Sequence, residues 1–398
     1  ATRGSHYRLS AVADRFAFEI LARSGRARRG RLHLAHGDVE TPAFMPVGTR
    51  GAIKALTIDA VEALGADIIL ANTYHLHVRP GDARIAALGG LHAFIGWSRP
   101  ILTDSGGYQV FSLAARRRVS DAGVVFQSHL DGRPLELSPE SAVDIQARIG
   151  ADIAMMFDEC VGWPATHDQA EAAMTRTLRW ARRGRDRFLA LQAGDDPSIV
   201  RSTPGQVQFG IVQGGTFPDL RDRSVDGTLA VGFDAYAIGG LSVGEPSDLM
   251  YEMVERVAGQ LPDDRPRYVM GTGTPDDLVA CVARGVDLFD CVMPTRNARN
   301  GQLFTREGPI SIKNARYADD LTPPDPACGC ATCRRHSRAY LRHLFMSGEM
   351  SAAALNTAHN LHFYLDTMRS IRKAIEFGTF ESFANAFLET YSRHRSIS

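Results

Sequence analysis

The chain has 398 residues, with 45 basic and 45 acidic side chains and a formal net charge of zero. Hydrophobic residues make up 44% and charged residues 23%, a globular composition that excludes disordered chains and low-complexity fibres. No run of about 18 apolar residues is present, so no transmembrane helix is expected, and the neutral balance excludes a uniformly basic protein.

The amino-terminal segment begins Ala1-Thr-Arg-Gly-Ser-His6, without an initiator Met and without an apolar run of signal-peptide type. We therefore expect residues 1–15 to form an N-terminal extension that includes residues added for expression.

Short apolar runs that end at a polar residue or a glycine recur along the next part of the chain. They are 67–71 before Asn72, 100–103 before Asp104, 153–157 before Asp158, 207–212 before Gln213, 235–238 before Gly239 and Gly240, 268–270 before Gly271, and 286–289 before Asp290. Continuous apolar runs bounded by turn residues favour strands that are buried on both faces, as in a parallel sheet.

Helical segments alternate with these runs. Thr166 and Gln169 form the pattern of a capping box before an apolar periodicity, and Pro275 opens a second helix. Strand–helix units over about 250 residues predict an α/β fold, a (β/α)8 TIM barrel spanning residues 16–315. A Rossmann fold is the alternative on pattern alone, but no Gly-x-Gly-x-x-Gly follows the first strand.

The barrel prediction places the strand-ending residues together, because TIM-barrel active sites lie at the carboxyl ends of the strands. We therefore expect Asn72, Asp104, Asp158, Gln213, Gly240 and Asp290 to converge. For any one of them, a helix N-cap or turn role is an equally good interpretation.

Three of these residues are aspartates, and carboxylates at one site suit chemistry at an anomeric carbon. One carboxylate attacks to give a covalent glycosyl-enzyme, and the other moves a proton. The pairs Gly106-Gly107 and Gly239-Gly240 allow the backbone to approach a flat ligand. Tyr108 and Met270 are candidates for stacking on its two faces, with core filling as the alternative role.

The carboxyl-terminal part has a different pattern. Pro323-Pro-Asp-Pro326 ends the alternation, and helical stretches follow, including one at 351–377 with an apolar stripe. Before it, Cys328, Cys330 and Cys333 lie within six residues, which favours a thiolate metal site in a reducing compartment over disulfides. Four candidates for the fourth ligand follow, namely His336, His343, His359 and His362. We expect residues 316–398 to form a zinc-binding helical subdomain.

The charge is unevenly distributed around that subdomain. Between residues 291 and 342 there are nine Lys or Arg against four acidic residues, so the rest of the chain is net acidic. The basic surplus adjoins Asp290 and the cysteine cluster. This arrangement predicts a local phosphate-binding face whose affinity depends on salt.

Several motifs in this order resemble one known family. They are Thr41-Pro-Ala-Phe-Met-Pro-Val-Gly-Thr49, Asn72-Thr-Tyr-His-Leu76, Leu102-Thr-Asp-Ser-Gly-Gly-Tyr-Gln-Val110, Asp158-Glu-Cys160, Ile211-Val-Gln-Gly-Gly215, Gly239-Gly-Leu-Ser-Val-Gly-Glu245, Asp290-Cys-Val-Met-Pro-Thr-Arg296, and the three cysteines with His359. Each is moderately specific, but together they cover nearly the whole chain in family order. The chain thus resembles the tRNA-guanine transglycosylases, also called queuine tRNA-ribosyltransferases.

The resemblance implies a role for each site residue. Asp290 would be the nucleophile on the ribose of the wobble guanosine, and Asp104 the general acid/base. The base would be bound by Asp104, Ser105, Gly106, Gly107, Tyr108, Asp158, Cys160, Gln213, Gly240, Leu241 and Met270. The RNA would be contacted by Gly271, Thr272, Gly273, Thr274, Pro275, Asp276, Asp277, Thr295, Arg296, Asn297, Ala298 and Arg299. One structural zinc ion per subunit would be held by Cys328, Cys330, Cys333 and His359.

The resemblance also implies the substrates and the setting. Val243 and Cys160 are similar to bacterial members, whereas the eukaryotic catalytic subunit has smaller or different residues there. The expected incoming base is therefore 7-aminomethyl-7-deazaguanine, inserted into the anticodon loop of the tRNAs for aspartate, asparagine, histidine and tyrosine during queuosine biosynthesis. A cytoplasmic homodimer without membrane contact is expected.

The chain departs from the family pattern at Gln127, at Gly162-Trp163 and at Asn297-Ala298, and the last change concerns the RNA-contact loop. Two other functions fit parts of the pattern. A non-catalytic RNA-binding subunit should lack the nucleophile and the acid, but Asp290 and Asp104 are present. A barrel glycoside hydrolase would not need a base-edge reader such as Asp158 with Gln213.

Overall fold

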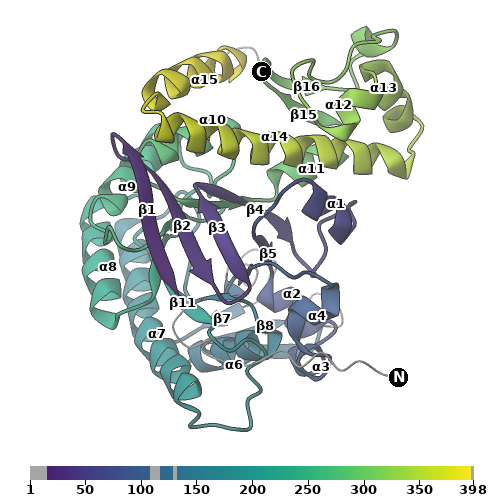
Figure 1. The fold of residues 1–398 in the computed structure, drawn as a ribbon. Helices are drawn as coiled ribbons and strands as arrows, with labels where there is room; N and C mark the ends of the chain where they lie inside the picture. Colours follow the sequence, from purple (N-terminus) through teal and green to yellow (C-terminus); the bar gives the residue numbers. More distant parts are fainter. Residues whose placement is uncertain (1–15, 108–116, 129–131, 396–398) are drawn as a thin grey trace.

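The computed structural model describes residues 16–107, 117–128 and 132–395 (Figure 1). Its centre is a closed barrel of parallel strands in the order β10-β11-β12-β13-β14-β4-β5-β6. Helices surround this barrel, so the predicted TIM barrel is confirmed. No helix in the described ranges is long and apolar enough to cross a membrane.

The eight barrel strands are short and almost entirely buried. They are β4 (Ala43–Gly48), β5 (Ile69–Ala71), β6 (Ile101–Thr103), β10 (Ile153–Met155), β11 (Val207–Val212), β12 (Ala235–Ile238), β13 (Arg267–Val269) and β14 (Leu288–Cys291). Seven of them coincide with the predicted apolar runs, and β4 was not predicted as a strand. Asp290 lies inside β14 instead of following it, because β14 continues to Cys291 against β4.

The helices that follow the barrel strands begin at recognisable caps. Thr166 and Gln169 cap α7 reciprocally, as their sequence pattern predicts. Pro275 opens α10 as predicted, and the Thr274 side chain caps that helix. These helices are α1 (Ile58–Ala63), α2 (Thr73–Val78), α3 (Asp82–Ala87), α4 (Gly90–Ile95), α6 (Pro139–Ile149), α7 (His167–Ala193), α8 (Pro218–Val231), α9 (Ser247–Ala258), α10 (Pro275–Val282) and α11 (Met293–Arg299).

Two antiparallel sheets that were not predicted flank the barrel. The first consists of β1 (Ala17–Ser24), β2 (Ala27–Leu34) and β3 (Gly37–Thr41). Its Arg28 is buried and pairs with Asp287, which immediately precedes β14, so this sheet is tied to the amino-terminal end of the barrel. The second sheet consists of β7 (Arg117–Val119), β8 (Val124–Gln127) and β9 (Pro134–Leu137).

The carboxyl-terminal region packs on the barrel through one long helix. Its elements are β15 (Gln302–Thr305), β16 (Gly308–Ser311), the 3-10 helix η1 (Ala315–Tyr317), α12 (Ala331–Arg335), α13 (Arg338–Met346), α14 (Met350–Glu376) and α15 (Phe380–Arg395). Helix α14 contacts β1, β2 and β4 as well as α11 and β15. Figure 1 shows it passing from α12 and α13 at one end to α15 at the other. Its predicted apolar stripe is part of the core, since Leu361, Leu365 and Met368 are buried.

Candidate active site and metal centre

Asp104 directly follows β6 and is held by three donors from the β5 and β6 ends. The backbone N–H groups of Thr73 and Gly106 donate to Oδ1 at 3.0 and 3.1 Å, and the Asn72 amide donates to Oδ2. Burial raises the pKa of Asp104 to about 7, the two N–H groups lower it, and the nearby carboxylates of Asp290 and Asp158 raise it further. Asp104 therefore exchanges its proton near neutral pH.

Asp290 lies at the carboxyl end of β14 with one oxygen anchored. The Tyr268 hydroxyl donates to Oδ1, and the Gly271 N–H donates to the same atom at 2.8 Å. Burial raises the pKa of Asp290, and these two hydrogen bonds oppose the shift. Among the described residues, no group donates to Oδ2, so this oxygen is available to a reacting carbon.

Asp158 and Gln213 form a buried polar pair after β10 and β11. The Gln213 Nε2 donates to Asp158 Oδ2 at 2.7 Å, and the Ser105 hydroxyl donates to Oδ1 at 3.2 Å. Burial raises the pKa of Asp158 to about 6, and both hydrogen bonds lower it. The Gln213 Oε1 atom is buried and has no hydrogen-bond partner in the described part of the chain. It is an acceptor that a planar polar ligand would satisfy.

The predicted glycines are required by close contacts at this pair. A Cβ atom on Gly107 would lie 2.7 Å from the Asp158 carbonyl oxygen. A Cβ atom on Gly240, where φ is +64°, would lie 2.3 Å from Gln213 Oε1. Both positions therefore exclude a side chain, and only backbone atoms lie next to Asp158 and Gln213 there.

Arg221 supports the glycine loops through hydrogen bonds to their carbonyl oxygens. This residue was not identified from the sequence. Its fully buried guanidinium donates to the carbonyl oxygens of Gly215 at 2.8 Å, Val212 at 3.0 Å, Gly239 at 2.7 Å and Gly240 at 3.3 Å. Burial lowers its pKa to about 10. No motif flags an arginine within a helix as a loop support, because its carbonyl partners depend on the tertiary fold.

The remaining candidates for base binding differ in burial. Leu241 is buried, whereas Met270 is half-buried beside Gly271. Cys160 is half-buried near Gly240, and burial raises the pKa of its thiol to about 12, so it stays protonated. Tyr108 lies outside the described residues.

The candidates for RNA contact are only partly exposed. Gly271 and Arg296 are exposed, and Thr274, Asn297 and Arg299 are half-buried. The others have buried side chains, namely Thr272, Pro275, Asp276, Asp277, Thr295 and Ala298, while Gly273 is also buried. Asp277, for example, accepts a hydrogen bond from the Tyr251 hydroxyl at 2.6 Å. RNA contact at 272–277 would thus have to use backbone groups and the half-buried Thr274.

A recess lies beside the base-binding candidates. It is lined by Val161, Trp163, Gly240, Val243 and Glu245, among others. The Glu245 carboxylate accepts backbone hydrogen bonds from Ser242 and, at 2.9 Å, from Val243. The recess therefore combines an apolar wall with one anionic group, and nothing in the sequence beyond a motif match had marked Glu245.

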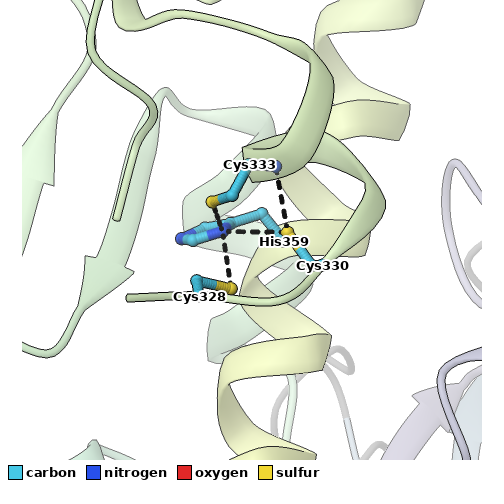
Figure 2. Close-up of side chains that lie close together, drawn as sticks. All are labelled: Cys328, Cys330, Cys333 and His359. Atoms are coloured by element: carbon cyan, nitrogen blue, oxygen red, sulfur yellow. Dashed lines mark hydrogen bonds between the residues drawn. The ribbon is translucent and has the colours of Figure 1, made fainter. Parts of the chain in front are cut away.

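The cysteine cluster closes around His359 of α14 (Figure 2). The Nδ1 atom of His359 lies 3.9 Å from the sulfur of Cys328, 3.5 Å from that of Cys330 and 3.2 Å from that of Cys333. Tetrahedral zinc with ordinary Zn–S and Zn–N bonds requires about 3.6 Å between such ligands, so the four side chains fit zinc. Among the four histidines left open by the spacing, His359 is the one in the cluster.

The protonation of His359 also fits a metal ligand. Its Nε2 donates to the Phe304 carbonyl oxygen at 2.8 Å, which leaves the Nδ1 lone pair facing the sulfurs. The same helix supports the neighbouring loops, because the Asn360 amide donates to the Pro294 carbonyl at 3.0 Å and the Tyr364 hydroxyl to the Gly273 carbonyl at 2.6 Å. The helix that carries His359 is thus hydrogen-bonded to Gly273, in one segment expected to contact RNA, and to Pro294, which immediately precedes the other.

Comparison with known proteins gives a consistent result. A family model described as queuine tRNA-ribosyltransferase matches residues 23–393. The queuine tRNA-ribosyltransferase of Aromatoleum aromaticum is 56% identical over 93% of this chain and 97% of its own length. Those of Shewanella frigidimarina and Zymomonas mobilis are 53% and 51% identical, over 94% and 96% of this chain and 98% and 97% of their own lengths.

Proposed function

Because the chain belongs to the queuine tRNA-ribosyltransferase family, and is therefore a pentosyltransferase, we propose that it exchanges a tRNA guanine for 7-aminomethyl-7-deazaguanine in queuosine biosynthesis. The target is the wobble guanine of the tRNAs for aspartate, asparagine, histidine and tyrosine. The observation that carries the proposal is the group of three carboxylates, buried Asp158 and half-buried Asp104 and Asp290, beside an amide with an unsatisfied oxygen.

The reaction proceeds through two displacements at the ribose C1′ atom. Oδ2 of Asp290 attacks C1′, the bond from C1′ to the guanine nitrogen breaks, and Asp104 gives its proton to the departing base. The incoming base then loses a proton to Asp104 and attacks C1′, which releases the Asp290 carboxylate. Two inversions leave the configuration retained, and no external energy source is needed because one glycosidic bond replaces another.

The pair formed by Asp158 and Gln213 reads the edge of the base. A carboxylate accepts from the N–H groups of a guanine-type ring, and an amide supplies both a donor and an acceptor. The unsatisfied Gln213 Oε1 and the backbone at Gly240 support this role, and Met270 and Tyr108 are assigned to the faces of the ring. A base read in this way must first leave the stack of the anticodon loop.

The segments 271–277 and 295–299 bind the RNA around the target nucleotide. Arg296 is exposed, and it belongs to the basic region between residues 291 and 342, which also includes the exposed Arg334 and Arg335. Their positive charge attracts the phosphates on either side of the flipped base. The overall neutral chain thereby acquires one RNA-binding face.

Zinc occupies the cluster of Cys328, Cys330, Cys333 and His359 as a structural ion. Four protein ligands leave no open coordination position, so the ion stabilises the fold and takes no part in catalysis. We assign residues 16–315 to the catalytic barrel, 316–398 to the zinc-binding subdomain and 1–15 to an extension. A homodimer in the cytoplasm completes the proposal.

The function is tested by incubating the protein with radiolabelled guanine and a tRNA that carries the wobble guanosine in a U-G-U loop. We expect label to enter the tRNA over multiple turnovers, and no label to enter a tRNA with adenosine at that position. Absence of exchange with correctly folded tRNA would contradict the assigned reaction.

Substitution Cys330→Ser is expected to remove the metal. A hydroxyl is a far weaker zinc ligand than a thiolate, so we expect affinity to fall about 100-fold or more. Elemental analysis of the purified protein checks this result, with Cys281→Ala as the control, because Cys281 is a buried cysteine of α10 outside the cluster. A zinc content in Cys330→Ser equal to that of wild type would contradict the four-ligand site.

Substitution Val243→Gly is expected to widen the range of incoming bases. The side chain of Val243 narrows the recess, while the Glu245 carboxylate there complements a small ammonium arm. Wild type should insert 7-aminomethyl-7-deazaguanine but not queuine, and the variant should gain queuine insertion by about 10-fold or more. Base-exchange assays with both bases measure this, and Val200→Gly, at an exposed site, is the control. Efficient queuine use by wild type would contradict the assigned specificity.

A further inference from the structure

A second cluster of metal-ligating side chains lies at the amino-terminal end of the barrel, opposite the candidate active site. It consists of His36 in the turn between β2 and β3, His92 in α4, and Asp152 immediately before β10. The two imidazole rings are stacked, with centroids 3.6 Å apart and planes inclined by 16°. No role in the proposed reaction accounts for this arrangement.

Each ring faces a different oxygen of the same carboxylate. His36 Nδ1 lies 2.8 Å from Asp152 Oδ1, and His92 Nε2 lies 3.0 Å from Asp152 Oδ2. The Asp152 side chain is fully buried, whereas 32% of the His36 side chain is exposed. The cluster is therefore closed on the barrel side and open to solvent at His36.

The second nitrogen of His92 leaves this arrangement unsatisfied while the His92 ring is neutral. Nδ1 of His92 lies 3.1 Å from the Gly150 carbonyl oxygen, which can only accept. In a neutral ring with the proton on Nδ1, the Nε2 lone pair points at the carboxylate, which is also an acceptor. A positive charge between Nε2 and Asp152 resolves the conflict. A proton on His92 supplies that charge for one ring alone, whereas one metal ion also engages the Nδ1 atom of His36.

The surrounding hydrogen bonds are those of a built metal site. The carboxylate of Asp152 is oriented by the His36 N–H on Oδ1 and the Ile101 N–H on Oδ2, both at 2.9 Å. A metal-binding imidazole commonly donates its other N–H to a backbone carbonyl, as His92 is placed to do with Gly150. The backbone donors that orient the carboxylate of Asp152 and the carbonyl partner of His92 are thus both in place in the structure.

We propose that His36, His92 and Asp152 bind one divalent transition-metal ion of the Zn²⁺, Ni²⁺ or Cu²⁺ class. Two imidazole nitrogens and one carboxylate oxygen suit these ions, and solvent completes the coordination on the open side. Metal bonds of about 2.0–2.1 Å separate tetrahedral ligands by about 3.3 Å, so the distances from nitrogen to carboxylate oxygen lengthen by only a few tenths of an ångström. The two rings must also turn out of their face-to-face stack, so that both nitrogen lone pairs point at one ion. The ion ties the turn between β2 and β3 and helix α4 to the start of β10, which makes the site structural.

The test uses the full chain with its cysteine cluster already loaded with zinc. Equilibrium dialysis against Zn²⁺, followed by elemental analysis, should give two equivalents in wild type and one in His92→Gln. The matched control is His33→Gln, because His33 also contacts a carboxylate, that of Asp38 at 2.8 Å, yet lies outside the His36–His92–Asp152 cluster. His33→Gln should retain two equivalents.

A second readout identifies the ligands directly. Cu²⁺ added to the zinc-loaded chain should give an electron paramagnetic resonance spectrum with hyperfine coupling to two imidazole nitrogens, reduced to one in His36→Gln. If His92→Gln fails to fold, His36→Gln at the more exposed ligand carries the dialysis test as well. Only one equivalent in wild type, or two equivalents retained in folded His92→Gln or His36→Gln, would overturn the proposal.

Discussion

Replacing Asp290 by Asn is expected to abolish the covalent adduct between protein and tRNA and to lower base exchange by about 10⁴-fold or more. An amide oxygen is a poor nucleophile, whereas Oδ2 of the carboxylate is left free by two hydrogen bonds that both end on Oδ1. The adduct is measured by denaturing electrophoresis after mixing the protein with tRNA, and exchange by incorporation of labelled guanine.

The control for this experiment is Asp264→Asn, an exposed aspartate whose ion pair is with the adjacent Arg265. It should form the adduct like wild type. Tyr268→Phe provides an intermediate case, since it removes one of the two donors to Asp290 and should lower exchange without abolishing the adduct. An adduct that survives in folded Asp290→Asn would assign the nucleophile to another residue.

Replacing Asp104 by Asn is expected to lower exchange by about 10²- to 10⁴-fold and to change its pH dependence. The pKa of Asp104 is raised to about 7, so the group is mainly protonated below that pH and loses its proton above it. Departure of guanine needs the protonated acid, and the rate of this step should therefore fall as pH rises through about 7.

The acidic side of the profile has a different origin. Asp158, with its pKa raised to about 6, must be ionised to accept from the base, and Asp290 must be ionised to attack. The rate should therefore also fall as pH drops below about 6, which gives a bell-shaped profile whose limbs belong to the coupled carboxylates as a group. Single-turnover rates of adduct formation between pH 5 and 9 measure it.

The Asp104→Asn variant separates these contributions. It should lose the decline above pH 7 while retaining the decline on the acidic side. A tRNA whose target nucleotide carries a base that is itself a good leaving group should restore part of the adduct formation of the variant. Such a base departs without taking up a proton. An unchanged alkaline limb in Asp104→Asn would show that another group supplies the proton.

The barrel was predictable because its strands are marked locally. Ile153 to Phe157 and Ala235 to Ile238 are continuous apolar runs, since both faces of a barrel strand are buried. Strand β4 lacks this mark because Pro46 interrupts it, although Asp290 and Cys291 pair with Met45 and Pro46 in the closed barrel. The sheet β1–β3 was missed because its charged residues, such as Arg28, find partners only in the tertiary fold.

The candidate site was predictable to the extent that its residues end strands. Asp104, Asp158 and Gln213 follow β6, β10 and β11, so strand order alone brings them to one end of the barrel. The groups that tune them were not predictable. Tyr268 acts through a hydrogen bond to Asp290, and Arg221 through four hydrogen bonds to loop carbonyl oxygens, contacts that exist only in the tertiary fold. Asn72 was expected at this end of the barrel, but its bond to Asp104 was not. The partial burial of 272–277 depends on how α10 packs.

The pairing of β14 with β4 has a consequence for how the protein is made. The strand that carries Asp290 closes the barrel against residues near the start of the chain, and α14 then packs on β4. During synthesis the early strands leave the ribosome long before their last neighbour, and such distant pairings form late in folding. The three carboxylates therefore meet only after the chain has been made beyond residue 291, so the candidate site is completed late in synthesis.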